Sequence, residues 1–480
     1  MTRLRPSLFL AVTLLSAAAP VLAQPAPKKP APTAPAPTAA PAAPKDETDT
    51  FQKDLDALFG QGGLTAEQAA KRAVAASPTV RRAIADIEVQ IAQAEAAELS
   101  RVPQIGATLG YTRLSDIDPA VVEIAGMSFE IAPVILNSYA ATARASIALS
   151  DYVWRYPKLI DAAKLGLEVA RVSRQSTEVN ASQDARLAYY EWVRSKLQVL
   201  VSERQLTNVK ATVTQVRALA DVQRVSRADL LRVESNEAQA EQAVIQLRLL
   251  AQLREEQLRL LIDEPAESQL SIGEDIRVEM TAPEAGKLDD MLKVARAQRL
   301  DFKVLDTGIR AKEKQRQAEK AGYYPKLSAF ANAEYSNPNQ RIFPQEEKFT
   351  FTWSAGAQIT WTLNDALYER TTDRRILGET NTLRADRESL DRGTRLQILV
   401  AQQAVANAQS ALATSQKGLT ASEEGYRVRR ELLNAERATA VELVDAETDL
   451  TRARIAALNA RVDLRVALTE LQHAVGADAK

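Results

Sequence analysis

The feature that most constrains this chain of 480 residues is an internal duplication. The segment 228–234, Ala-Asp-Leu-Leu-Arg-Val-Glu, returns at 441–447 as Val-Glu-Leu-Val-Asp-Ala-Glu, each time inside a long helical pattern. A strand entry led by Pro103 returns in the same way at Pro325. Both copies keep one order: helix, strand, loop, strand, very long helix, turn and long helix. Few architectures combine strands of bilayer length with helices of about 100 Å, so the duplication predicts an α+β protein made of two such repeats.

The N-terminal residues predict export. Residues 1–23 combine a basic start, a short apolar stretch and Val-Leu-Ala before Gln24, which is typical of a cleaved secretory signal peptide rather than an uncleaved anchor. Residues 24–50 are rich in Ala and Pro and predict a disordered linker, a passive spacer in preference to a docking motif. The chain has no cysteine, which excludes disulfides, thiol chemistry and a lipid-modified cysteine.

The remaining sequence divides into a first structural repeat at 51–275 and a second at 276–480. Neither contains an uninterrupted apolar run of the ~18–20 residues that a membrane helix needs, because Arg248 breaks the best candidate. If the protein sits in a membrane, the sequence predicts that it does so as a β-barrel.

Apolar residues in the last helix of each repeat alternate steps of three and four, the heptad pattern of left-handed helix packing. The second copy has ten such positions: Leu443, Ala446, Leu450, Ala453, Ala457, Ala460, Leu464, Ala467, Leu471 and Ala474. The first copy keeps the register from Leu230 to Leu261, with Glu237 and Arg254 as exceptions. The preceding helix of the second copy carries a seam of small residues from Ala401 to Gly425, which predicts close backbone approach. An ordinary coiled-coil hairpin would show the same periodicity.

Four segments alternate apolar with small or polar residues and predict long strands. They cover residues 105–112, 139–149, 327–335 and 349–363, with Phe330 as the one misfit. Each approaches or exceeds the ~9–11 residues of a tilted transmembrane strand, and the last carries aromatic residues toward its ends. Four strands are too few to close a membrane barrel, so a spanning sheet requires several copies of the chain. The alternative is a small antiparallel sheet that caps a soluble coiled coil.

From about Thr65 to Gly476, the chain resembles the TolC-like outer-membrane efflux proteins. The similar features are the two Pro-led strand entries, the strand-to-helix exits at 149–151 and 363–365, and the tip segments at 226–231 and 439–447. The resemblance implies four long transmembrane strands per chain in a trimeric 12-stranded β-barrel in the outer membrane, continued by an α-helical coiled-coil barrel in the periplasm. It also implies a periplasmic adaptor, an inner-membrane pump and outer-membrane lipid as partners. The sequence departs from the family pattern at Gln223 and Glu436, where a turn glycine is common, and in a longer segment at 426–441.

The same resemblance implies the site residues. Glu442 and Asp445 match an acidic ring at the periplasmic entrance, and Asp229, Tyr426 and Arg437 are candidates for polar links that hold this constriction shut. A further set comprises candidates for adaptor contact at the tips: Val225, Ser226, Arg227, Ala438, Thr439 and Ala440. Solvated charges on a polar helix face, and ordinary helix capping by Ser and Thr, are the alternatives.

The functional expectation is therefore a passive exit duct of a tripartite efflux or type I secretion system. No catalytic, metal-binding or cofactor motif is present, His473 is more typical of a structural residue, and the near-neutral net charge of −1 disfavours nucleic-acid binding. The alternative function is a periplasmic coiled-coil scaffold with a small β-cap. A requirement for detergent distinguishes the two.

Overall fold

The computed structural model describes residues 46–116, 118, 121–130, 134–278, 280, 286–435 and 437–479. The predicted signal peptide and residues 24–45 of the predicted linker lie outside these residues. The chain divides into one unit at 1–50 and a second at 51–480, and the description below concerns the second. Helix α1 (Asp46–Leu58) begins inside the range predicted as linker.

The first repeat follows the predicted order. Its elements are β1 (Phe59–Leu64), α2 (Ala66–Ala76), α3 (Pro78–Leu99), β2 (Gln104–Arg113), β3 (Val121–Ile124), β4 (Met127–Glu130), β5 (Asn137–Ala148), α4 (Asp151–Trp154), α5 (Tyr156–Asp221) and α6 (Arg227–Ile262). The β3–β4 hairpin lies in a segment that the sequence predicts only as a loop.

The second repeat has the same order without that extra hairpin. Its elements are α7 (Leu288–Gln298), α8 (Leu300–Glu319), a 3₁₀ helix (Lys320–Tyr323), β6 (Lys326–Asn337), β7 (Thr350–Thr360), α9 (Leu363–Asn434), α10 (Ala440–Val475) and a second 3₁₀ helix (Ala477–Ala479). The strand predicted at 349–363 is too long at its end, because α9 already begins at Leu363. The division into two repeats remains a prediction, because residues 51–480 pack as one compact unit with no boundary between the repeats.

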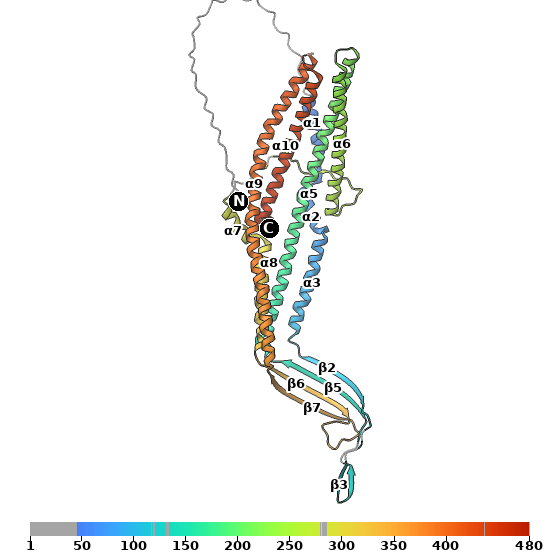
Figure 1. Ribbon diagram of the computed structural model, residues 1–480, viewed down its shortest axis with the longest axis vertical. Coiled ribbons are helices and arrows are strands. Elements are labelled where there is room, and N and C mark those ends of the chain that lie inside the picture. Colours follow the sequence, from blue (N-terminus) through green and yellow to red (C-terminus); the bar gives the residue numbers. More distant parts are fainter. Residues whose placement is uncertain are drawn as a thin grey trace, which may run out of the picture. The chain divides into compact units, whose positions relative to one another are not determined.

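The long helices lie side by side. At the end away from the sheet, contacts give the order α6, α5, α10, α9, and Figure 1 shows these four side by side. Nearer the sheet the order is α3, α5, α8, α9. Helices α5 and α9 contain 66 and 72 residues, so each spans about 100 Å. Among the described residues, no helix is both long and apolar enough to cross a membrane.

The four long strands form one antiparallel sheet in the order β2, β5, β6, β7. Their register aligns the predicted faces across all four strands. One row of the apolar face is Ile105, Ala145, Ala331 and Ala355, and the next is Ala107, Ala143, Ala333 and Trp353. The opposite face is polar along most of its length. Phe330 lies on this polar face and covers Gly356, where an added methyl group would lie 3.0 Å from the ring.

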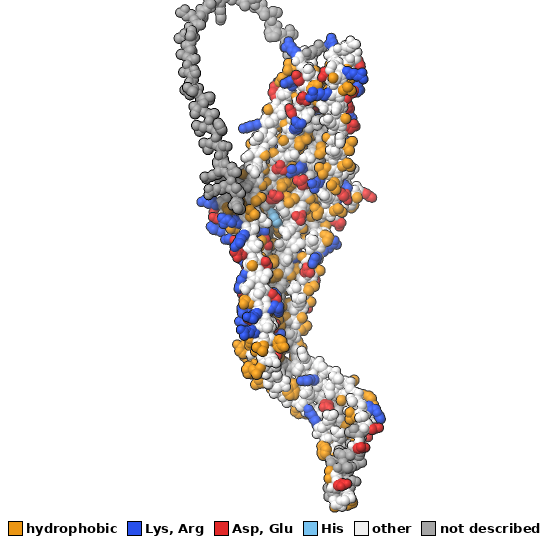
Figure 2. All heavy atoms as spheres, in the orientation of Figure 1, with side chains coloured by type: hydrophobic (Ala, Val, Ile, Leu, Met, Phe, Trp, Pro, Cys, Tyr) orange, Lys and Arg blue, Asp and Glu red, His pale blue; other side chains and the backbone are white. Residues whose placement is uncertain are grey.

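Aromatic side chains lie at both ends of the sheet. Tyr111, Tyr139, Tyr335 and Phe349 contact one another at the end away from the helices, with ring centroids 5.0–6.2 Å apart. At the helical end Trp154 stacks on Tyr324 at 5.8 Å. Figure 2 shows hydrophobic side chains gathered where the helices meet the sheet. The exposed residues there include Trp361, Leu363, Leu367 and Tyr368.

The heptad seam predicted for α10 is confirmed, because most of its positions are buried against α9 and α5. The small-residue seam of α9 is only partly correct. Ala401 and Ala408 are buried, but beyond them the inward line passes through Leu412, Leu419 and Tyr426, one position later. Ala411, Gly418 and Gly425 are exposed instead. Larger side chains at the adjacent positions bury more apolar area and therefore take the inner face.

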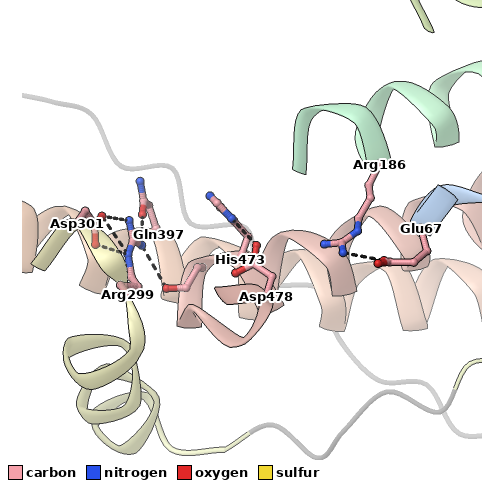
Figure 3. A network of polar contacts seen from close by, with 8 residues as sticks. Glu67, Arg186, Arg299, Asp301, Gln397, His473 and Asp478 are labelled. Atoms are coloured by element: carbon pink, nitrogen blue, oxygen red, sulfur yellow. Dashed lines mark hydrogen bonds and ion pairs between the residues drawn. The ribbon is translucent and has the colours of Figure 1, made fainter. Parts of the chain in front are cut away.

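Charged side chains fix the connections near the middle of the helices. Arg465, 5% exposed, donates to Glu274 at 3.1 Å and to backbone carbonyls of residues 275, 276 and 278, which ties the link between the repeats to α10. Figure 3 shows Arg299 beside Asp301 and Gln397, and His473 beside Asp478. The His473 Nδ1 to Asp478 Oδ2 distance is 2.7 Å, so His473 contacts the segment that follows α10.

Candidate functional site: the two hairpin tips

The first tip is the turn between α5 and α6. Gln223 adopts a φ of +59°, the left-handed conformation that favours glycine. This is the turn position at which the resemblance noted from the sequence leads us to expect a glycine. Ser226 caps α6 by accepting from the Asp229 amide at 3.1 Å, and its hydroxyl donates to the Asp229 carboxylate at 2.6 Å. Asp229 therefore has a local role at the helix N-terminus, where a negative charge is favourable.

The second tip, between α9 and α10, repeats this geometry. The Arg437 amide donates to the Leu432 carbonyl at 2.8 Å, as Arg224 does to Leu219 at 2.9 Å in the first tip. Thr439 accepts from the Glu442 amide at 3.3 Å, which places Glu442 where Asp229 stands in the first repeat. Glu436, the counterpart of Gln223, lies outside the described residues.

Glu442 and Asp445 lie one turn apart at the start of α10, and both are exposed. Glu442 accepts from Arg429 of α9 at 2.7 Å, so its charge is partly neutralised within the hairpin. Asp445 has no ion pair within the part of the chain that the structure describes. The sequence reasoning missed Arg429. Counting back from the turn along both helices would have placed Arg429 opposite Glu442.

The remaining constriction candidates differ in exposure. Tyr426 is 9% exposed and packs with Leu433, Leu443 and Leu450 inside the second hairpin. Arg437 is exposed at the turn, and its described hydrogen bond comes from its backbone amide. The tip thus brings Glu442, Asp445 and Arg437 to the surface and leaves the Tyr426 ring in an apolar cluster.

The candidates for adaptor contact also separate into two groups. Ser226, Arg227 and Thr439 are exposed, whereas Ala440 is 4% exposed. Val225 and Ala438 are partly buried against the tip clusters. Of these six candidates, the two capping residues and Arg227 are therefore the ones exposed in a single chain.

The apolar packing differs between the tips. Val216 of α5 is fully buried in a cluster with Val209, Val213 and Val233 of the first hairpin, and with Ala440 and Val444 of α10. In the second repeat the position of Val216 is taken by Arg429, which is exposed. The α9 side of the second tip carries further exposed pairs, in which Arg427 contacts Glu424 and Glu431. The Arg427 hydrogen bonds lower the pKa of Glu424 below its usual range.

The described residues of the tips make ion pairs, helix-capping hydrogen bonds and apolar contacts. Within the described ranges, no group of three or more His, Asp or Glu side chains could hold a metal ion. Figure 2 shows acidic and basic side chains interspersed over the α6 end of the helices. Such a surface suits contact with water, ions or a polar partner.

Three comparisons with known proteins bear on this fold. Residues 291–477 match the family model described as outer membrane efflux protein. A search of curated proteins gave no match. Solved structures similar to this one include CusC, with a TM-score of 0.72 at 13% identity over 87% of this chain and 93% of that chain. The open state of the MtrE outer membrane channel of Neisseria gonorrhoeae gives 0.70 at 18% identity over 86% and 88%.

The CmeC outer membrane channel of Campylobacter jejuni is similar over a larger share of this chain, with a TM-score of 0.70 at 13% identity over 93% and 94%. The TM-scores of 0.70–0.72 over most of each chain establish a shared fold of helical layer and β-domain. The family model covers most of α7, strands β6 and β7, helices α8 to α10, and the second tip. The second repeat therefore carries the sequence match to the outer membrane efflux protein model, and the described chain as a whole shares the fold of these solved channels.

Proposed function

We propose that this chain is one third of an outer-membrane exit duct, which passively conducts solutes delivered by an inner-membrane pump through a periplasmic adaptor. The observation that carries the proposal is that the described chain has an edge element without a further neighbour on each of its two sides, in the sheet, in the adjoining helices and toward the tips. These edges are β2 and β7 in the sheet, α3 and α9 in the adjoining helices, and α6 and α9 toward the tips. A neighbouring copy supplies the missing partner at each level with one rotation.

The sheet gives the strongest physical reason for closure. Its apolar face, with Ile105, Leu109 and Trp353 at least 70% exposed, suits lipid, and the aromatic side chains at both ends suit the two membrane interfaces. In lipid, each unpaired backbone group at the edges of β2 and β7 would cost several kcal/mol. Three copies joined edge to edge give twelve strands, above the minimum of about eight for a membrane barrel.

The helices favour the same closure. Ile245, Leu249, Leu253 and Leu260 form an apolar stripe on α6, and each is more than half exposed. On α9 the exposed positions Ala411, Gly418 and Gly425 are small, and a methyl group added at either glycine would meet nothing within 4 Å. Leu249 and Ala411 lie about 33 and 35 Å from the tip ends of their helices, so they meet at one height when α6 packs on the α9 of a second copy.

The tips support the proposed partners. Their exposed polar groups, Ser226, Arg227 and Thr439, lie at the end farthest from the sheet, where a periplasmic adaptor would reach the duct. The acidic residues Glu442 and Asp445 favour cations at that entrance. The proposed duct serves efflux or type I secretion, and the identity of the pump determines what it carries.

The test is single-channel recording of the purified mature protein, extracted in detergent and added to a planar bilayer. Discrete, small conductance steps with cation preference are expected from a duct whose entrance is narrowed by acidic side chains. Protein that dissolves without detergent and gives no steps would contradict the proposal and favour the periplasmic scaffold with a β-cap.

A further inference from the structure

The loop between β6 and β7 folds back over the polar face of the sheet. The Asn339 side chain, in a residue 2% exposed, donates from Nδ2 to the Thr350 carbonyl at 3.1 Å and to Thr352 Oγ1 at 3.2 Å. Arg341 reaches farther along β7, donating from Nη1 to the Trp353 carbonyl and from Nη2 to Ser354 Oγ, each at 3.2 Å. Thr352 and Ser354 both lie on the polar face, so the guanidinium of Arg341 lies on that face as well.

A second arginine shares this row of the sheet. The register aligns Ser354 with Asn332, and Asn332 with Arg144 of β5. Arg144 and Ser354 are thus two strands apart, about 10 Å between backbones, with the Asn332 amide between them. The fourth position of the row is Gly106, where an added methyl group would meet nothing within 4 Å, so the β2 side does not cover Arg144.

The other charges on the polar face do not cancel this pair. Glu334 lies two residues along β6 and accepts from Ser336 at 2.8 Å, while Lys326 adds a positive charge at the helical end of the same face. Arg341, Arg144 and Lys326 therefore outnumber Glu334 among the described side chains on this face. The loop itself also carries Glu346 and Glu347, which are exposed beyond Arg341.

We infer that Arg144 and Arg341 form a cationic exit filter for solutes bearing phosphate or carboxylate groups. The inference rests on the proposed trimeric duct, in which the polar face lines the barrel and three such rows bring six guanidinium groups to one level. Guanidinium groups bind phosphate and carboxylate oxygens through paired hydrogen bonds. The acidic entrance and this basic exit then carry opposite charge at the two ends of one channel.

The test is block of single-channel potassium current by pyrophosphate, added separately to each side of a planar bilayer. Pyrophosphate is expected to block the unmodified channel from one side only, the side of the loops. In the variant R144Q/R341Q, the concentration needed for half block should rise at least tenfold. The single variant R341Q removes one of the two guanidinium groups, with its contacts to β7, and should give part of this shift. The variant R144K keeps the charge but not the paired hydrogen bonds, and should retain part of the block.

The matched control is R113Q, because Arg113 lies at the outer end of β2 on the opposite face, where it donates to Asn137 at 3.3 Å. This variant should be blocked as the unmodified channel is. Channels that open normally but show the same block in R144Q/R341Q would overturn the exit filter and leave the duct standing. If the unmodified protein formed no channels at all, the proposed duct would fail and the exit filter with it.

Discussion

The two hairpin tips share a backbone but differ in what holds them. Both have an equivalent turn hydrogen bond, an N-capping hydroxyl and an acidic residue at the third helical position. Val216 anchors the first tip in a buried cluster shared with α10, whereas Arg429 at the same place in the second tip makes an exposed ion pair. Exposed pairs contribute about 0–1 kcal/mol, less than burial of a Val side chain at about 1.5–3 kcal/mol. At this position the first tip is therefore held by apolar packing and the second by a weaker exposed pair, although the second hairpin has its own apolar cluster around Tyr426.

The largest expected effect comes from exchanging the residues that distinguish the tips. The variant V216R places a charge in a fully buried apolar cluster, which should destabilise the first tip by at least about 3 kcal/mol. The reverse change, R429V, removes only an exposed pair and should cost no more than about 1 kcal/mol. Hydrogen exchange of the 209–233 and 426–444 segments measures both. Equal exchange in the two variants would show that the tips are held alike.

A second prediction concerns the charge of the second tip. Replacing Glu442 and Asp445 together with Ala should reduce the cation preference of the proposed channel several-fold, because its proposed entrance loses two carboxylates per chain. The variant R429V should act in the opposite direction, since it removes the cation that neutralises Glu442. Reversal potentials in a potassium chloride gradient measure both changes. Unchanged selectivity in the double variant would remove these residues from the constriction.

A third prediction tests the turn of the first tip. Gln223 has a positive φ, so the β-branched variant Q223V should destabilise the turn by about 1–2 kcal/mol. The variant Q223G should be close to neutral, because relief of strain is offset by the greater freedom of glycine in the unfolded chain. Amide exchange at residues 219–226 distinguishes them. Faster exchange in Q223G than in Q223V would contradict the geometry of this turn.

The smallest effect is expected from acidification. Arg427 lowers the pKa of Glu424, so the contribution of this carboxylate to stability is present above its unfolded pKa, near 4.5, and is lost as pH falls through the lower folded value. Exchange near 424–431 should therefore increase below about pH 4. The stability of the apolar cluster around Val216 should not depend on pH in this way. The variant R427Q serves as the control, because its exchange in this segment should lose that increment of pH dependence.

Most of the fold could be predicted from the sequence, because its patterns of apolar residues continue over many residues. Heptad spacing over α10 and alternation over β2, β5, β6 and β7 each extend over enough residues to define an element. The errors fall where patterns compete or are short. At Trp361–Leu363 alternation continues past the end of β7, while the backbone already turns into α9. The four-residue strands β3 and β4 are too short to show a period.

The candidate site was less predictable, because its contacts cross turns whose geometry the sequence does not state. The pair between Arg429 and Glu442 depends on the number of residues in the second turn, and the burial of Tyr426 depends on which of two adjacent seams faces α10. The return of Arg341 onto Ser354 depends on the path of an irregular loop. The residue types at these positions predicted polar side chains, but they did not predict which residues those side chains contact.

The most direct test of the central claim, that three copies complete one duct, is a cross-link between α6 and α9. Because the natural chain has no cysteine, the variant L249C/A411C contains only the two introduced thiols. In detergent, a short bifunctional maleimide should link each α6 to the α9 of the next copy. A denaturing gel should then show a series of bands that ends at three chains, while L249C and A411C alone remain single chains. Only single chains in the double variant, or bands extending beyond three, would contradict a closed trimer.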